Sequence, residues 1–296
     1  MNANLLLIDG NNLCFRVHWT NRELSYKGTP VSLIYGFYRS FIYLKKKFPE
    51  YIPIVVWDKG SSRRKKEAAS AVEKGIIPSG YKANRKKDEP DEMLLSLFEQ
   101  LDMLKDDLSE YIRLQQVTIP GLEADDIIYT YAKVNKGKTI AITSDKDFYQ
   151  MLDDNVVVYD AMKKKEWTKD VFTEEYGIEP YQWVDVGALT GDKSDNIFGC
   201  PGIGPVNAFK FIKEFTTVEG VIEGLSNSKN KLSKKEKAVL DNIEVLRLAK
   251  SLKQMDCHPD VLPEYRCPVR DEEKLKEYFK SFGFETLMND AWRLII

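Results

Sequence analysis

Short apolar segments alternate, along the first half of the chain, with longer segments whose apolar residues recur every three or four positions. The predicted strands lie at residues 5–8, 54–57, 113–119 and 139–143, and the predicted helices at residues 31–44, 94–108 and 124–134. Short, continuous apolar runs are typical of strands buried on both faces, and parallel strands need crossover helices between them. The alternation therefore predicts an α/β fold, with a parallel sheet covered by helices on both faces.

The second part of the chain has a different pattern. Strands become rare after about Val156, and helical spacing dominates from Tyr181 onward, interrupted at residues 191–205 and 226–237. A polar, basic stretch at residues 61–90 is too long for a tight turn, and loops of that length tend to be functional or mobile. We expect three parts, namely a Rossmann-like core at residues 1–180, a helical domain at residues 181–260, and a C-terminal segment at residues 261–296 that returns to the core.

Composition is typical of a globular protein. The chain has 296 residues, of which 43% are hydrophobic and 30% charged, enough to bury a sizeable core. Its longest apolar runs are far too short to cross a bilayer, and no signal-peptide pattern opens it, so we expect a cytoplasmic protein without membrane contact. The four cysteines, at positions 14, 200, 257 and 267, are widely spaced and form no CxxC pair. This spacing argues against a disulfide framework or a zinc site.

Acidic residues follow the predicted strands at the points where these strands end. Asp9 and Asp58 each come directly after a strand, and Asp145 and Asp147 follow a third. Because the carboxyl ends of parallel strands lie along one edge of a sheet, these side chains should gather there. The other acids expected near the same edge, at a helix start and in a glycine-bounded loop, are Glu123, Asp125, Asp126, Asp192 and Asp195.

These nine carboxylates together predict a site for divalent cations. Like charges crowded in one site disfavour their own ionised forms unless cations are bound. The predicted ligands are all oxygen atoms, and both histidines, His18 and His258, lie outside the set, which suits Mg²⁺ or Mn²⁺. Two such ions roughly 3.5–4 Å apart can activate water against a phosphodiester and stabilise the leaving oxygen. We therefore expect two bound Mg²⁺ or Mn²⁺ ions.

Each acid taken singly also has an ordinary structural interpretation. An aspartate after a strand is often a turn residue, and acids in the first turn of a helix are often caps. Only the joint pattern favours a metal site. A phosphatase with an aspartyl nucleophile would also start with a strand and an aspartate, but the segment Asp9-Gly10-Asn11 lacks the second aspartate that serves as acid in such enzymes.

The net charge of −2 does not by itself suit a protein that binds DNA, since phosphate affinity normally needs a basic surface. If the nine carboxylates share one pocket, however, the rest of the chain carries a net positive charge, and bound cations neutralise much of the pocket. Basic runs occur at residues 45–47, 63–66, 85–87, 163–165 and 229–237. Any one such run is more often a solvated face than a binding site.

Five motifs, taken in order, resemble the acidic motifs of the structure-specific 5′-nuclease superfamily, which includes phage flap endonucleases and the amino-terminal nuclease domain of bacterial DNA polymerase I. They are DGNN at residues 9–12, WDKG at 57–60, GLEADD at 121–126, TSDKD at 143–147 and GDKSDN at 191–196. The resemblance spans nearly the whole chain and implies a PIN-like core with a helical helix-hairpin-helix DNA-binding domain. Because no polymerase domain follows, we expect a stand-alone enzyme of the phage type.

The resemblance implies flap endonuclease and 5′→3′ exonuclease activity in DNA replication or repair. The implied substrates are branched or 5′-ended DNA, including flaps, nicks and RNA primers, and we expect a monomer in the cytoplasm of a bacterium or of a phage-infected host. Two other functions stay open, namely a nucleic-acid-binding scaffold without catalysis and a phosphomonoesterase. The intact acid set argues against the scaffold.

The resemblance also implies roles for single residues. Asp9 and Asp145 count among the catalytic residues, and Asp126 belongs to the acidic set without a distinct assignment. The first metal is expected near Asp58, Glu123, Asp125 and Asp145, with Asp9 close by, and the second near Asp147, Asp192 and Asp195.

The segment Tyr81-Lys82-Ala83-Asn84-Arg85 resembles the family segment that precedes the helical arch, here at about residues 61–100. In this family the 5′ strand is thought to pass through the arch. We expect Lys82 and Arg85 to bind DNA and act in catalysis by shielding the scissile phosphate, and Tyr81 to stack on a base. The alternative interpretation is an exposed basic loop.

Residues 199–205 and the helical segment after them look like the helix-hairpin-helix element of the family. Glycines in such an element let backbone atoms approach a phosphate or a bound monovalent cation. We expect DNA contacts from Gly202, Ile203, Gly204 and Lys210, with K⁺ as a candidate ion there. A simple turn between helices would have a similar sequence.

Overall fold

We describe residues 2–21, 23–85, 92–263 and 272–288 of a computed structural model. At the centre of the molecule is a six-stranded sheet with the strand order β5-β4-β1-β6-β7-β8. Its strands are β1 (Leu5–Asp9), β4 (Ile52–Trp57), β5 (Gln115–Thr118), β6 (Thr139–Ile142), β7 (Val156–Asp160) and β8 (Lys165–Trp167). The strand pairs are parallel except for β7 and β8, which are antiparallel. A separate two-stranded hairpin consists of β2 (Ser25–Tyr26) and β3 (Thr29–Pro30).

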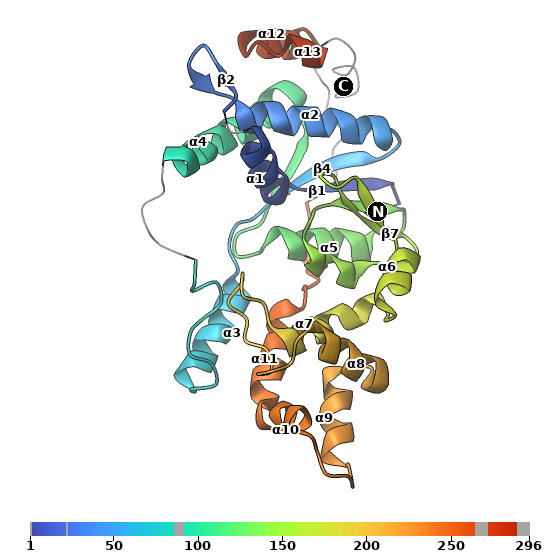
Figure 1. The fold of residues 1–296 in the computed structure, drawn as a ribbon. Helices are drawn as coiled ribbons and strands as arrows, with labels where there is room; N and C mark the ends of the chain where they lie inside the picture. Colours follow the sequence, from blue (N-terminus) through green and yellow to red (C-terminus); the bar gives the residue numbers. More distant parts are fainter. Residues whose placement is uncertain (1, 22, 86–91, 264–271, 289–296) are drawn as a thin grey trace.

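Helices cover both faces of the sheet (Figure 1). The helices of the α/β part are α1 (Gly10–Asn21), α2 (Ser32–Lys47), α4 (Glu92–Asp107), α5 (Ala124–Val134) and α6 (Lys169–Tyr176). Successive residues of β1 point to opposite faces, so Leu6 packs in one apolar cluster with Phe37 of α2, whereas Leu7 packs in another with Ile128 of α5. Burial on both faces explains why the central strands β1, β4 and β6 consist mostly of apolar residues.

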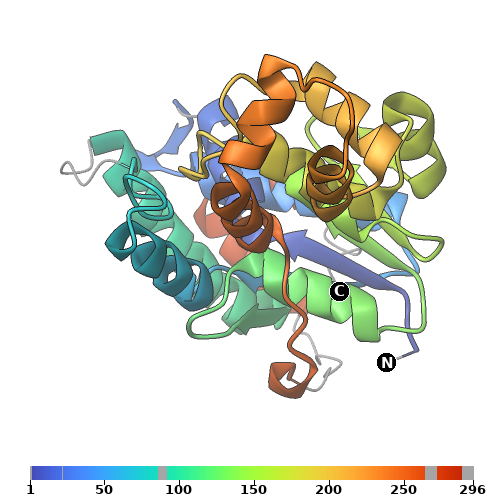
Figure 2. The ribbon, with the colours of Figure 1, turned by 90° about the horizontal axis from the view of Figure 1, so that it is seen from below.

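The helical part begins after α6 and lies below the sheet in Figure 1. Figure 2 views the molecule from that side. Its helices are α7 (Trp183–Thr190), α8 (Pro205–Phe215), α9 (Val218–Ser226), α10 (Lys234–Asp241) and α11 (Ile243–Lys253). Helix α11 packs against α7 and also against α3 (Ser62–Glu73), which precedes it by almost two hundred residues. Buried residues of these helices belong to the same apolar cluster as those of α5, so the helical part is continuous with one face of the core. Within the described ranges, no helix has both the length and the hydropathy needed to span a bilayer.

The last described helices, α12 (Glu272–Ser281) and α13 (Glu285–Met288), lie beside α2 at the opposite end of the molecule (Figure 1). The ring of Phe279 lies 5.1 Å from that of Tyr38, and the ring of Tyr278 stacks on that of Tyr111 at 4.4 Å. The Tyr278 hydroxyl donates a hydrogen bond to Asp107. These contacts join the C-terminal helices to the α/β part.

Short helices fill several connections. They are a π-helical turn, η1 (Leu108–Ile112), and the 3₁₀ helices η2 (Lys146–Met151), η3 (Pro180–Gln182) and η4 (Pro259–Val261).

The predicted α/β class and parallel sheet are confirmed, but two expectations about local structure are wrong. Residues 62–73 form the regular helix α3 within the stretch expected to be a loop, while residues 86–91 lie outside the described residues. Only Arg64, Ala68 and Ala71 of α3 are buried, and so small an apolar stripe gives little helical signal. Strands β7 and β8 extend the sheet beyond the predicted strands.

Candidate active site

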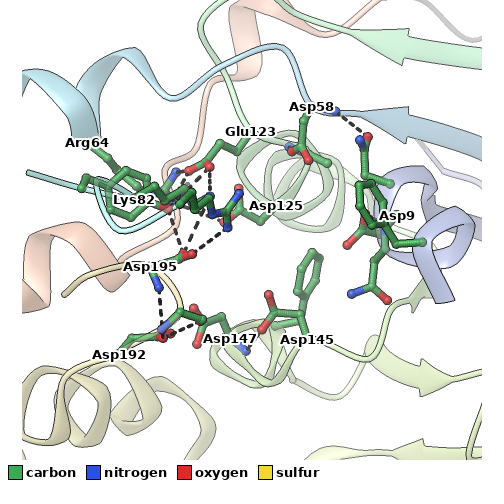
Figure 3. A pocket seen from close by; sticks show the side chains of 18 of the residues that line it. Asp9, Asp58, Arg64, Lys82, Glu123, Asp125, Asp145, Asp147, Asp192 and Asp195 are labelled. Carbon is green, nitrogen blue, oxygen red and sulfur yellow. Dashed lines mark hydrogen bonds and ion pairs between the residues drawn. The ribbon is translucent and has the colours of Figure 1, made fainter. Parts of the chain in front are cut away.

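A cavity of about 650 Å³ opens at the carboxyl edge of the sheet. Figure 3 shows that its acidic side chains come from separate segments and surround a common space. The acids that line the cavity are Asp9, Asp58, Glu123, Asp125, Asp145, Asp147, Asp192 and Asp195. The fold therefore brings together eight of the nine acids expected from the sequence.

The acids at the strand ends are held by local hydrogen bonds. Asp9 is the last residue of β1, and its two carboxylate oxygens accept from the Asn12 amide (3.0 Å) and the Thr143 hydroxyl (3.1 Å). Asp58 follows β4 and accepts from the Ala124 amide at the start of α5, at 2.7 Å. A carboxylate at a helix N-terminus is favoured by the unpaired amides and the helix dipole, so α5 holds Asp58 at the cavity.

The turn after β6 presents two more acids. The Asp145 carboxylate accepts from the Asp147 amide at 2.9 Å and so caps η2. The Asn12 side-chain oxygen accepts from both the amide (3.1 Å) and the hydroxyl (2.8 Å) of Ser144. Asn12 thus joins the turn after β6 to the turn after β1, and it fixes Asp9 and Asp145 relative to each other.

Crowding and burial favour protonation of part of this cluster. Burial raises the pKa of Asp9 to about 7, and the neighbouring charges of Asp58 and Asp145 contribute to the rise. Burial also raises the pKa of Asp125 well above its usual value, even though the guanidinium of Arg64 opposes the rise. Carboxylates with raised pKa values gain most from a nearby cation, which removes the repulsion between them.

Arg64 supplies one such cation from α3. Its guanidinium is only 3% exposed, and it donates to Glu123 (2.8 Å) and to both oxygens of Asp126 (2.7 and 2.8 Å). Asp126 also accepts from the Asp256 amide at 2.9 Å, and it does not line the cavity. This placement differs from the expectation that Asp126 joins the metal ligands, because Arg64 and Asp256 already engage its carboxylate.

Lys82 and Arg85 reach the cavity from the loop after α3, as expected from the sequence. The Lys82 ammonium pairs with Glu123 and lies 3.7 Å from Asp195, and the Arg85 guanidinium pairs with Asp195 at 2.9 Å. Figure 3 shows Arg64 and Lys82 on the side of Glu123 and Asp195, while Asp9 and Asp58 lie on the other side. The loop thus sets positive groups at one wall of an acidic cavity.

The position of Tyr81 corrects the expectation that its ring stacks on a base. Tyr81 is 7% exposed and belongs to the core cluster. Its hydroxyl donates to Glu123 (3.1 Å) and Asp195 (3.0 Å), so the residue presents its hydroxyl to the cavity rather than a free ring face. An aromatic ring buried in the core has no face left for a nucleobase.

A second buried basic residue besides Arg64 is Lys253, at the end of α11. Its ammonium is bonded to Asp147 at 2.5 Å and to Asp192 at 2.8 Å, and its side chain is 6% exposed. Neither Lys253 nor Arg64 is singled out by the sequence analysis, and Arg64 lies in a basic run. The available signal was positional: Arg64 shares a helix face with Ala68 and Ala71, and Lys253 shares one with Ala249.

The donor set fits divalent cations that prefer oxygen ligands. Among the ion pairs of the described residues, none involves Asp9, Asp58 or Asp145, so these three acids would gain directly from a bound cation. As the side chains stand, no three His, Cys, Asp or Glu residues in the described part of the chain are arranged to hold a metal ion. A bound ion would therefore need small shifts of carboxylates, some of which already contact Lys82 or Lys253.

The expected helix-hairpin-helix residues lie just before and along α8 and do not line the cavity. Gly202 and Gly204 are exposed, and a Cβ atom added at either would meet no other atom within 4 Å. Lys210 is exposed on α8. Ile203 is only 5% exposed, so its side chain packs inward and only its backbone is available for the DNA contact expected there.

Comparisons with known proteins agree with this geometry. The chain matches the 5′-3′ exonuclease, N-terminal resolvase-like domain, over residues 4–177, and the 5′-3′ exonuclease, C-terminal SAM fold, over residues 178–270. The thermostable DNA polymerase I of Thermus filiformis is 32% identical over 291 residues, which cover 97% of this chain and 33% of that protein. This chain therefore spans about a third of the length of its polymerase relatives.

Two further proteins match over most of their own length. A 5′-3′ exonuclease of Aquifex aeolicus is 29% identical over 295 residues, which cover 97% of this chain and 94% of that protein. The solved structure of the T5 5′-exonuclease with bound zinc ions has a TM-score of 0.69 and 25% identity, and the match covers 84% of this chain and 89% of that one. Taken with the matches to both domains of the family, these similarities show that the chain belongs to the 5′-3′ exonuclease family.

Proposed function

We propose that this nuclease hydrolyses phosphodiester bonds in branched or 5′-ended DNA, using Mg²⁺ or Mn²⁺ held by the carboxylates of the cavity. The observation that carries the proposal is the convergence of eight acids on one cavity, with Lys82 and Arg85 at its wall. Oxygen-only ligands suit these metals, and clustered carboxylates that disfavour their own ionisation gain from binding them.

The resemblance to the 5′-nuclease family supports a division of the acids between two ions. We assign the first ion to Asp58, Glu123, Asp125 and Asp145, with Asp9 beside them, and the second to Asp147, Asp192 and Asp195. When bound, a pair of divalent cations activates water and neutralises charge on the phosphate during phosphodiester hydrolysis. Asp126 is better explained as the partner that holds Arg64, since Arg64 bonds both of its oxygens.

Lys82 and Arg85 have a separate role at the phosphate. Negative charge builds on the phosphate oxygens in the transition state, and a positioned cation at the cavity wall stabilises it. The Lys82 amide donates to the Asp195 carbonyl at 2.8 Å, so its backbone is fixed relative to the acids. A substrate phosphate in the cavity would compete with Glu123 for the Lys82 ammonium.

We assign duplex contact to the segment before α8. The exposed backbone at Gly202 and Gly204 can approach a phosphate or a bound K⁺ ion without side-chain obstruction. Lys210 on α8 and Lys235 on α10 add positive charge, and Lys235 reaches Asn207 of α8 at 3.1 Å. We propose flaps, nicks and RNA primers as substrates, as the resemblance to the 5′-nuclease family implies.

The experiment compares an end-labelled 5′-flap duplex, the matching nicked duplex and a simple phosphate monoester. We expect chelator to abolish cleavage of the DNA substrates, Mg²⁺ or Mn²⁺ to restore it, and the monoester to stay intact. Wild-type rates in excess chelator would falsify the proposal, and hydrolysis of the monoester alone would indicate a phosphomonoesterase.

The matched variant is Asp145→Asn. An asparagine oxygen can still accept from the Asp147 amide, so the η2 cap and the fold should survive while a negative charge is lost. Turnover should fall nearly to zero with an unchanged melting temperature. An active Asp145→Asn protein would show that Asp145 is not a metal ligand.

A further inference from the structure

Lys253 is the last residue of α11, and its ammonium lies between two acids of the second group. The bonds to Asp147 (2.5 Å) and Asp192 (2.8 Å) each use one carboxylate oxygen. Figure 3 shows these two acids next to each other along one edge of the cavity, where they come from different segments of the chain. One buried ammonium therefore forms ion pairs with two carboxylates.

The packing around Lys253 leaves its side chain little freedom. Its aliphatic part lies along α7 at Gly187, where an added Cβ atom would come within 3.1 Å of the Lys253 Cε. The Gln150 side chain donates to the Lys253 carbonyl (3.1 Å) and to the Asp147 carbonyl (2.9 Å). Gln150 also accepts from the Met255 amide at 3.0 Å. The hydrogen bonds of Gln150 and the contact with α7 thus fix the position of the Lys253 ammonium relative to Asp147.

The charges of this group reinforce one another. Burial alone would lower the pKa of Lys253, but the carboxylates of Asp147 and Asp192 raise it above its usual value. Burial opposes ionisation of Asp192 too, yet Lys253 and the hydrogen bonds from Ser194 lower the pKa of Asp192 to about 2. The ion pairs of Lys253 with Asp147 and Asp192 thus set an ammonium in the place where a second cation would be needed.

We propose that Lys253 is a resident cation of the Asp147–Asp192 pair, which holds the two carboxylates together and competes with the second divalent ion for their oxygens. The proposal rests on the assignment of Asp147 and Asp192 to that ion. It implies unequal affinities. All three acids assigned to the second ion pair with basic side chains, whereas in the first group only Glu123 and Asp125 do so among the described residues. The second ion would therefore bind more weakly than the first, because it must displace the buried Lys253 ammonium from two of its three ligands.

The test measures Mn²⁺ binding to the DNA-free protein by isothermal titration calorimetry, so it does not depend on activity. We expect wild-type protein to bind one ion tightly and one weakly. Lys253→Met should strengthen the weaker site by about 10- to 100-fold, within the usual range of coupling between two binding events. The tighter site should change little.

Lys250→Met is the matched control. Lys250 lies on the same helix and pairs at 2.6 Å with the buried Asp185, which does not line the cavity. Its loss removes a comparable ion pair, so both variants should be destabilised, but Lys250→Met should leave both Mn²⁺ sites unchanged. Mn²⁺ should also raise the melting temperature of Lys253→Met more than that of wild-type protein, because a ligand stabilises the state that it binds more tightly.

A second variant covers the case in which Lys253→Met does not fold. Gly187→Ala keeps the Lys253 charge, but the added methyl group would crowd the aliphatic part of the Lys253 side chain. It should strengthen Mn²⁺ binding at the weaker site by a smaller factor than Lys253→Met does. If Lys253→Met folds, unchanged or weaker Mn²⁺ binding in that variant would overturn the role of Lys253. If only Gly187→Ala folds, the same result in Gly187→Ala would overturn it. Absence of Mn²⁺ binding in wild-type and variant proteins alike would instead overturn the metal assignment itself.

Discussion

Lys82 combines an unusual backbone conformation with a central position in the cavity. Its φ angle is 56°, in the left-handed region that residues other than glycine, asparagine and aspartate rarely adopt. The hydrogen bond from its amide to the Asp195 carbonyl holds this conformation and directs the side chain toward Glu123. A disfavoured conformation maintained by surrounding bonds at a functional site is consistent with a positioned catalytic group.

Lys82→Ala should lower the single-turnover cleavage rate of a flap substrate by about 10²–10³-fold, the scale seen when one preorganised donor is removed. DNA affinity should change little, since one phosphate contact is a small part of the electrostatic attraction. The measurement uses enzyme in large excess over substrate. Lys133→Ala, which removes an exposed pair with Asp153 at 3.5 Å, is the control and should cleave normally. A near-normal rate for Lys82→Ala would make the segment an ordinary basic loop.

The acids of the site could be predicted from sequence because strand ends determine where they lie. Asp9, Asp58 and Asp145 needed only the rule that parallel strands end at one edge of the sheet. Arg64 and Lys253 could not be predicted in the same way, because the burial of a charged side chain depends on packing between helices far apart in the chain. The contact between α3 and α11 that buries Arg64 has no local signal in either sequence.

At the scale of elements, the start of α8 offers the clearest test of DNA binding. Gly204 is the N-cap of α8 with φ −97°, a value open to any residue, whereas Gly202 has φ +78°. A Cβ atom added at position 204 would meet no other atom within 4 Å, so we expect a substitution there to leave the fold intact. A substitution at position 204 can therefore distinguish loss of DNA contact from loss of the folded structure.

Gly204→Leu should weaken binding of duplex DNA, because the side chain would keep the backbone away from the phosphate. Each lost phosphate contact should reduce the slope of log affinity against log salt by about 0.9. A salt titration of duplex binding measures this slope, with the melting temperature as the control for folding. Wild-type affinity and slope in the variant would exclude phosphate contact at this turn.

Elements with strong periodicity were predicted well. The helix at residues 124–134 agrees with α5, and the predicted strands at 5–8, 54–57 and 139–143 fall within or overlap β1, β4 and β6. Strand β8 was missed because it is three residues long and mostly polar, and its place in the sheet depends on pairing with β7. A short edge strand carries little signal of its own, since its stability comes from the neighbouring strand.

At the scale of the whole molecule, the C-terminal helices are joined to the α/β part at Asp107. Burial raises the pKa of Asp107 to about 6, although the hydrogen bond from Tyr278 opposes the rise. The folded protein thus holds this proton more tightly than the unfolded chain. The stability that protonation of Asp107 contributes is fully present below its unfolded pKa and is lost as the pH rises through about 6.

An asparagine at position 107 cannot ionise, so the Asp107→Asn variant should lose less stability than wild-type protein between pH 5 and pH 8. At pH 8 the variant should be more stable by about 1–2 kcal/mol, roughly half of the full linkage value because the carboxylate is partly open to solvent. Urea denaturation at the two pH values measures the difference. Asp102→Asn, at an 81% exposed position of α4, keeps Asp107 and should lose as much stability between the two pH values as wild-type protein does. Equal behaviour of both variants would contradict the role of Asp107.

The loop that carries Lys82 is bonded directly to the loop that carries Asp195. The Lys82 amide donates to the Asp195 carbonyl (2.8 Å), the Asn84 side chain to the Lys193 carbonyl (2.5 Å), and the Asn196 side chain to Ser79 (2.9 Å) and Gly80 (2.7 Å). These two segments are over a hundred residues apart in the sequence but form one unit in space. A chimeric enzyme in which the segment around Lys82 is replaced by that of another nuclease would therefore also need the other nuclease's counterpart of residues 193–196. Without it, the new segment would lack the hydrogen-bond partners that orient its lysine.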